Sequence, residues 1–313
     1  MKAWQFNGTH KPFTRVEIDE PTAGPGKVVV DVKAAGLCHS DVGILEDEKW
    51  LAFTKVPIVP GHETAGVISE VGEGVTEWQV GDRVAVWPML GPFGYGVNGG
   101  WEARAEAETE QLVRIPEGLS FEKAAAATDA GMTSAGAVFG KGEVKAGMKV
   151  GIIGFGGLGQ IGARLAHLEG AEVYVAEVKE DVWETAKAQG AVKVAKSITE
   201  FKDDNLDVII DFAGFGTTTN EAIQTVKFQG KVVLVGMGRL EATIDTNPMI
   251  LGQVTLVGSN GGSKDDIAMV MKWMASGELE PTITMIDFEE IADGVKMLEE
   301  GKVTGRLVAK VAD

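Results

Sequence analysis

The chain has 313 residues of ordinary globular composition, a length that favours two domains over a single α/β core. Its net charge of −17 argues against nucleic acid as a partner, because the phosphates would be repelled. Its apolar runs are too short for a membrane span, no signal peptide is expected, and a single cysteine favours the cytoplasm.

The first part of the chain, residues 1 to about 130, consists of short apparent strands broken by Gly and Pro. Examples are the stretches 27–32 and 63–71, which are bounded by turn signals. The Gly-rich stretch 90–100 is a loop by composition. This pattern predicts a small barrel-like β domain.

Two metal-ligating residue types flank these strands. Cys38 and His62 lie on loops beside different strands, so a folded barrel can bring them together. Thiolate and imidazole are zinc ligands, Asp41 can accept the second ring N–H of a ligating histidine, and Glu63 adds an oxygen. The alternative is that Cys38 is a small buried side chain and His62 a hydrogen-bonded core residue.

A change of pattern follows Ser120, which is a plausible N-cap for a helical tract. From residue 149 the rhythm becomes strand, turn and helix, which predicts a parallel, doubly wound sheet. The apparent strands are 149–153, 172–176, 192–194, 207–212, 231–235 and 255–257, with helical patterns that include 159–169 and 182–189. Amphipathic stretches at 263–276 and 288–300 precede a last strand, 306–311, which we expect to return to the first domain.

A glycine motif follows the first of these strands. Gly154 permits a tight turn, Gly156 lets a pyrophosphate approach the backbone, and Gly159 lets helix and strand pack closely. Gly157 and Leu158 open the helix, whose free N–H groups suit phosphates. The alternative is a packing turn without a ligand.

The strand 172–176 leads into Glu177, whose carboxylate can accept both ribose hydroxyls of NAD and would repel a 2′-phosphate. Lys179 favours NADP to a small extent, because its positive charge could bind the 2′-phosphate. The motif and Glu177 together favour NAD.

The motifs GLCHSD, PGHE, VGEGV, GDRV, GFGGLG and GRLV occur here in the order seen in zinc-dependent medium-chain alcohol dehydrogenases, which the whole chain resembles. The resemblance implies an α/β protein with a GroES-like catalytic domain, residues 1–130 completed by 260–313. It also implies a Rossmann NAD-binding domain over 131–259.

The resemblance implies a ligand set as well. Cys38 and His62 match the first two zinc ligands, and Asp129 stands where many members have a cysteine, as in some bacterial secondary-alcohol dehydrogenases. The alternative is that Asp129 only caps a helix. Glu63 is a candidate fourth ligand. Because the chain lacks the four cysteines of the structural-zinc lobe, one catalytic zinc per chain is predicted.

By the same resemblance, Ser40 passes the alcohol proton onward, Asp41 supports the catalytic site, and His39 and Arg306 contact the pyrophosphate. In some relatives a histidine completes the proton relay. It has no counterpart here, because the matching position lies near Gly43. Trp50, Trp87, Met89 and Leu90 are candidates for an apolar substrate pocket, although such residues are more often plain core. A homodimer or homotetramer paired along the strand near 255–258 is expected.

These features predict a cytoplasmic zinc- and NAD-dependent alcohol dehydrogenase acting on small or medium uncharged alcohols, secondary ones included. Two alternatives are a zinc-free quinone or enoyl reductase of the same superfamily and a non-catalytic NAD(P)-binding protein. Cys38, His62 and Asp129 disfavour the first, and these ligands with Ser40 disfavour the second.

Overall fold

The structure, a computed structural model, describes residues 1–89 and 91–312 and divides into two compact units. The first unit comprises Met1–Ala130 and the segment from Ser263 to the end of the chain, and the second comprises Gly131–Gly262. Within the described residues, none of the helices has the length and apolar character that a membrane crossing requires.

A mixed sheet forms the centre of the first unit. Its strands run in the order β14 (Ile283–Asp287), β15 (Arg306–Lys310), β3 (Lys27–Leu37), β4 (Glu63–Val71), β5 (Arg83–Val86) and β7 (Leu112–Arg114), and β6 (Arg104–Glu108) also pairs with β3. A separate two-stranded sheet consists of β1 (Lys2–Gln5) and β2 (Thr14–Glu17). The last strand of the chain thus pairs with β3, as predicted.

Helical segments cover this sheet. They are α1 (His39–Glu46), α2 (Phe121–Ala126), α8 (Lys264–Ser276) and α9 (Ile291–Glu299), with 3-10 turns at Glu48–Ala52, Thr109–Gln111 and Phe288–Glu290. Ser120 is the N-cap of α2, as predicted, but its hydroxyl makes no capping hydrogen bond within the described part of the chain. The alanines of α2 are completely buried, and because they are small the helix packs closely on β3, β4 and β15.

The helix that follows α2 is widened. The segment η3 (Ala127–Gly131) is π-helical, α3 (Met132–Ala135) is α-helical, and η4 (Gly136–Lys141) is π-helical again. Single π turns inside helices are frequent at functional sites. Asp129 lies in the middle of the first of these turns.

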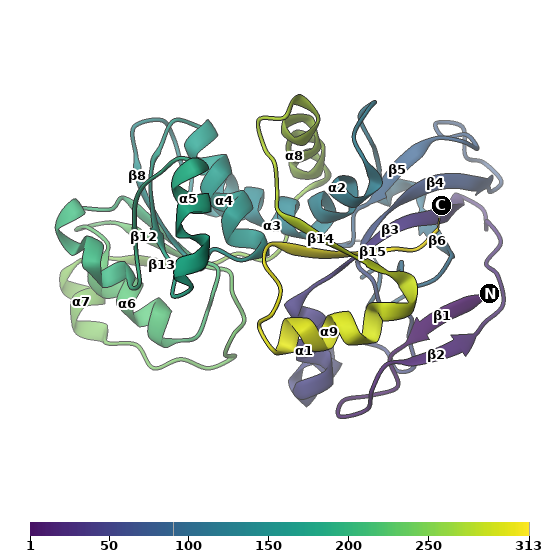
Figure 1. Ribbon diagram of the computed structural model, residues 1–313, viewed down its shortest axis with the longest axis horizontal. Coiled ribbons are helices and arrows are strands. Elements are labelled where there is room, and N and C mark those ends of the chain that lie inside the picture. Colours follow the sequence, from purple (N-terminus) through teal and green to yellow (C-terminus); the bar gives the residue numbers. More distant parts are fainter. Residues whose placement is uncertain (90, 313) are drawn as a thin grey trace. The chain divides into compact units, whose positions relative to one another are not determined.

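The second unit contains a six-stranded sheet in which every neighbouring pair is parallel. Its order is β10 (Ala191–Ala195), β9 (Glu172–Ala176), β8 (Lys149–Ile153), β11 (Val208–Asp211), β12 (Lys231–Leu234) and β13 (Thr255–Gly258). Its remaining helices are α4 (Gly157–Leu168), α5 (Trp183–Ala188), α6 (Thr217–Thr225) and α7 (Thr246–Leu251), with 3-10 turns at Glu180–Val182 and Ile198–Asp204. Figure 1 shows α4, α5 and α6 beside these strands. The predicted doubly wound sheet is confirmed, with strand bounds shifted by a residue or so.

Candidate functional site

The ends of three strands meet at one place in the first unit. The antiparallel register sets Gly36, near the end of β3, opposite Glu63 at the start of β4 and opposite Val308 of β15. Cys38 follows β3 directly, His62 precedes β4 directly, and Arg306 is the first residue of β15. The pairing of β3 with two neighbours therefore gathers residues that are far apart in sequence.

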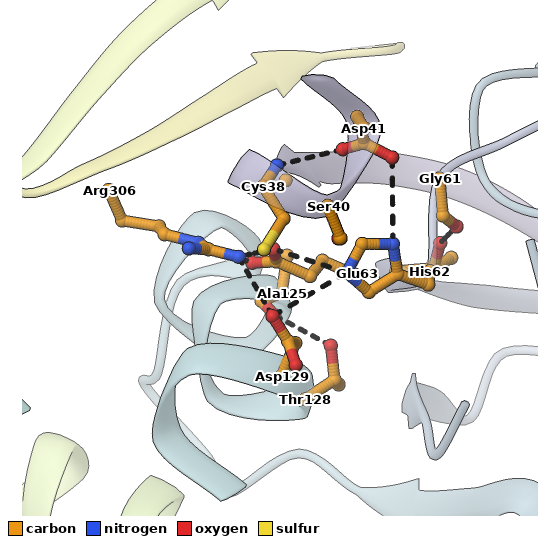
Figure 2. Close-up of polar contacts among 12 residues, drawn as sticks. Cys38, Ser40, Asp41, Gly61, His62, Glu63, Ala125, Thr128, Asp129 and Arg306 are labelled. Carbon is orange, nitrogen blue, oxygen red and sulfur yellow. Dashed lines mark hydrogen bonds and ion pairs between the residues drawn. The ribbon is translucent and has the colours of Figure 1, made fainter. Parts of the chain in front are cut away.

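Four potential metal ligands converge at this point, as Figure 2 shows. The sulfur of Cys38, a ring nitrogen of His62 and carboxylate oxygens of Glu63 and Asp129 all lie within 4.8 Å of one another. The Nε2 atom of His62 is 3.5 Å from Oδ2 of Asp129 and 3.9 Å from Oε1 of Glu63. The widened turn η3 carries Asp129 into this group beneath the strand ends.

Asp41 lies on the other side of His62. Its Oδ2 accepts a 2.8 Å hydrogen bond from the backbone N–H of Cys38. Its Oδ1 is 3.8 Å from Nδ1 of His62, and neither of these two buried atoms has a hydrogen-bond partner within the described chain. Asp41 thus faces the ring nitrogen that points away from the cluster, where a carboxylate fixes the orientation of a ligating histidine.

Arg306 holds the two acidic members of the cluster. Its Nε donates to Oε2 of Glu63 at 2.9 Å, its Nη2 donates to Oδ2 of Asp129 at 3.0 Å, and Nη2 also contacts Oε1 of Glu63. The side chain is only 4% exposed. Gly36 makes room for this arrangement, because a Cβ there would lie 2.3 Å from Oε2 of Glu63.

The charges of the cluster suit a divalent cation. Burial lowers the pKa of His62, but Asp129, Cys38 and Asp41 together raise it well above its usual 6.5. Burial has the opposite effect on the Asp41 carboxyl and raises its pKa. The carboxylates of Asp41, Glu63 and Asp129 outnumber the single guanidinium of Arg306, which contacts both Glu63 and Asp129. A thiolate, an imidazole and carboxylates form an acceptable donor set for zinc.

Tyr95 joins the site from the Gly-rich loop, and no motif or residue pattern singled it out. Its ring stacks on the imidazole of His62 at a centroid distance of 5.0 Å and an interplanar angle of 26°. Its hydroxyl donates a 2.7 Å hydrogen bond to Oγ of Ser40. Burial, followed by the charge of Asp41, raises the pKa of Tyr95 well above 10, so it remains a neutral phenol.

In the second unit, the predicted glycine turn links β8 to α4. Gly154 has φ +85°, and a Cβ at Gly159 would lie 1.9 Å from the carbonyl oxygen of Gly154. A Cβ at Gly156 would meet nothing within 4 Å, which leaves open space beside the backbone. Two of the glycines therefore serve the turn itself, and the third borders the space where a phosphate is expected.

Glu177 lies beside this turn. Its Oε2 accepts a 2.7 Å hydrogen bond from the backbone N–H of Phe155, and its Oε1 accepts one of 2.8 Å from the N–H of Lys179. These bonds fix the carboxylate between the glycine turn and the end of β9. Recognition of the ribose hydroxyls by Glu177 stays a prediction, with which this placement at the end of β9 is consistent.

Comparison with known proteins identifies the family. Residues 24–117 match the alcohol dehydrogenase GroES-like domain, and residues 157–276 match the zinc-binding dehydrogenase domain. An alcohol dehydrogenase of Geobacillus stearothermophilus is 32% identical, and the alignment covers 99% of this chain and all of that protein. The chain belongs to the zinc-type medium-chain alcohol dehydrogenase family.

Solved structures of this family are similar throughout. Acetophenone reductase from Geotrichum candidum, in complex with NAD, has a TM-score of 0.90 and 27% identity, over 99% of this chain and 97% of that one. Alcohol dehydrogenase from Aeropyrum pernix also has a TM-score of 0.90, with 26% identity, over 99% and 100%. The predictions of a GroES-like and Rossmann fold and of an alcohol dehydrogenase are confirmed.

The residues predicted for the site fall into separate groups. Cys38, His62, Glu63 and Asp129 are brought together, with Ser40 and Asp41 beside them. Arg306, predicted to contact the pyrophosphate, lies with Glu63 and Asp129, and His39 is exposed at the start of α1; the cofactor roles of both remain predictions.

The predicted substrate residues have mixed surroundings. Trp50 packs on the core of the first unit and over Gly43, where a Cβ would lie 2.6 Å from the indole. A histidine would therefore not fit at this position without a shift of Trp50. Trp87 is half-buried, Met89 is exposed, and Leu90 lies outside the described residues.

The buried guanidinium provides a first prediction. Arg306→Met should destabilise the metal-free protein by about 3–5 kcal/mol, because the buried Glu63 and the half-buried Asp129 would be left without their cation. The matched control is Lys123→Met, which breaks a more exposed pair with Glu280 (2.6 Å) and should cost about 0–1 kcal/mol. Urea unfolding after dialysis against a chelator measures both losses. Equal losses would show that the Arg306 contacts contribute no more than a surface pair.

Proposed function

We propose that the chain catalyses reversible hydride transfer between NAD and a small or medium uncharged alcohol, secondary alcohols included, at one zinc ion held by Cys38, His62 and Asp129. The observation that carries this proposal is the convergence of these three side chains and Glu63 within 4.8 Å. Glu63 is the candidate fourth ligand. Family membership and the glycine turn support the cofactor part.

Each side chain has a defined task in this reaction. Bound zinc would supply a Lewis acid that lowers the pKa of the alcohol. The hydroxyl of Ser40 receives the alcohol proton, and Asp41 keeps the His62 ring oriented. Arg306 holds the carboxylates of Glu63 and Asp129 in place. Because the position near Gly43 holds no histidine, Ser40 would release its own proton to the cofactor ribose or to water as it accepts the alcohol proton.

The metal assignment is tested by zinc content and activity. We expect about one zinc per chain in the wild type, loss of NAD⁺ reduction on chelation, and recovery on adding zinc. Asp129→Ala should lose both zinc and activity on primary and secondary alcohols, while Asp293→Ala, at an exposed position of α9, should lose neither.

The other outcomes discriminate between hypotheses. Zinc and activity retained in Asp129→Ala would remove Asp129 from the site and make Glu63 the third ligand. A metal-free wild type that reduces quinones or enones would establish the zinc-free reductase instead. A zinc-loaded protein that turns over none of these substrates would indicate a non-catalytic NAD(P)-binding protein.

The preference for NAD over NADP depends on Glu177. We expect kcat/KM to be at least about tenfold higher with NAD, since a 2′-phosphate would face this carboxylate. Glu177→Gln keeps the oxygen that accepts from Phe155 but removes the charge, so the preference should shrink. Lys179→Ala is the control and should leave the NAD rate unchanged. Equal wild-type rates with both cofactors would contradict the assignment.

We propose a homodimer or homotetramer formed along β13. In the described sheet this strand is at the edge and pairs only with β12, so its outer N–H and C=O groups are available to a second copy. Light scattering should give the mass of two or four chains. Gly258→Pro, at a position with open space around a Cβ, should shift the mass to one chain. A monomeric wild type would contradict this proposal.

A further inference from the structure

Tyr95 contacts two residues with different proposed roles. Its ring lies against His62, a proposed zinc ligand, and its hydroxyl donates to Ser40, the proposed proton acceptor. One contact is made by the ring and the other by the hydroxyl of the same rigid side chain. A substitution of Tyr95 can therefore affect both His62 and Ser40.

The loop that carries Tyr95 is fixed by close backbone packing on the turn that carries His62. Gly94 has φ +85°, and a Cβ there would lie 2.8 Å from the backbone nitrogen of His62. A Cβ at Gly99 would lie 2.6 Å from the carbonyl oxygen of Gly61. Side chains at either position would push the loop away, so the glycines allow Tyr95 to reach the site.

Hydrogen bonds of the backbone hold Tyr95 itself. Its N–H donates to the carbonyl oxygen of Pro92 at 2.9 Å, and its own carbonyl accepts from the N–H of Lys55 at 2.8 Å. The main chain on both sides of the ring is thus anchored. The phenol is presented to Ser40 by a fixed backbone.

The direction of the hydrogen bond determines what Ser40 can do. A serine hydroxyl has one hydrogen and two acceptor lone pairs. The Tyr95 O–H occupies one lone pair, which leaves the other lone pair for the alcohol proton. The serine's own hydrogen points away from Tyr95 and is released to the cofactor ribose or to water as the alcohol proton arrives, so the hydroxyl is neutral again. A hydroxyl held in this way does not have to reorient before it accepts a proton.

We propose that Tyr95 is a positioning residue for proton transfer, whose hydroxyl sets the orientation of the Ser40 hydroxyl while its ring holds the plane of the His62 imidazole. This inference rests on the proposed function, because it requires Ser40 to receive the alcohol proton. It adds a residue from the Gly-rich loop to the catalytic arrangement.

The test is a double-mutant cycle of Ser40→Ala and Tyr95→Phe in the zinc-loaded enzyme, with zinc content and KM measured for each variant. Tyr95→Phe keeps the ring, so zinc content and KM should be unchanged while kcat falls about three- to tenfold. Ser40→Ala should lower kcat about 100-fold or more. The double variant should be no slower than Ser40→Ala alone, because the Tyr95 hydroxyl acts only through Ser40.

The chain provides a matched control in its only other tyrosine. Tyr174 is buried on β9, and its hydroxyl donates to Glu172 at 3.3 Å. Tyr174→Phe should leave kcat unchanged. Tyr95→Leu removes the ring as well and should additionally weaken zinc retention against a chelator.

The results distinguish a failure of the proposed role of Tyr95 from a failure of the proposed role of Ser40. A wild-type kcat in Tyr95→Phe, or losses that multiply in the double variant, would overturn the role of the Tyr95 hydroxyl. Unchanged zinc retention in Tyr95→Leu would overturn the role of the ring. If Ser40→Ala itself keeps full activity, the proposed function of Ser40 fails, irrespective of Tyr95.

Discussion

The first unit depends on one buried guanidinium that lies between two carboxylates. Arg306 and Glu63 are separated by 243 residues in sequence, yet their side chains meet at 2.9 Å. Without the positive charge, Glu63 and Asp129 would be two like charges within a few ångströms in a poorly hydrated place. The segment that follows the second unit is therefore needed to complete the arrangement that the first 130 residues begin.

Much of the second unit could be predicted from sequence, because its features are local. The strand β8, the glycine turn and α4 are consecutive, and the need for glycine at 154 and 159 follows from the turn alone. The contacts of Arg306 with Glu63 and Asp129 could not be predicted from the sequence. They depend on the register of three strands, which no short stretch of sequence specifies, and the family resemblance directed attention to the pyrophosphate.

The candidate metal site illustrates the same division. Cys38 and His62 could be predicted as ligands from their residue type, and Asp129 from its position in the family motif. Neither kind of evidence points to Tyr95. The composition of its stretch, residues 90–100, predicts a loop and nothing about the site. The glycines instead allow two backbones to touch at Gly61 and Gly94. The only signal available in the sequence was a tyrosine in a stretch of residues 90–100 that is rich in glycine.

The second unit is an uninterrupted segment inserted into the first, and the two ends of this segment lie together. A Cβ at Gly136 would be 2.4 Å from the carbonyl oxygen of Gly261, so the backbone near the first residues of this unit lies against the backbone near its last residues. Domains whose ends lie close together tolerate insertion into another chain and circular permutation. The second unit thus has the geometry of a domain inserted into the first, with its two ends at neighbouring residues.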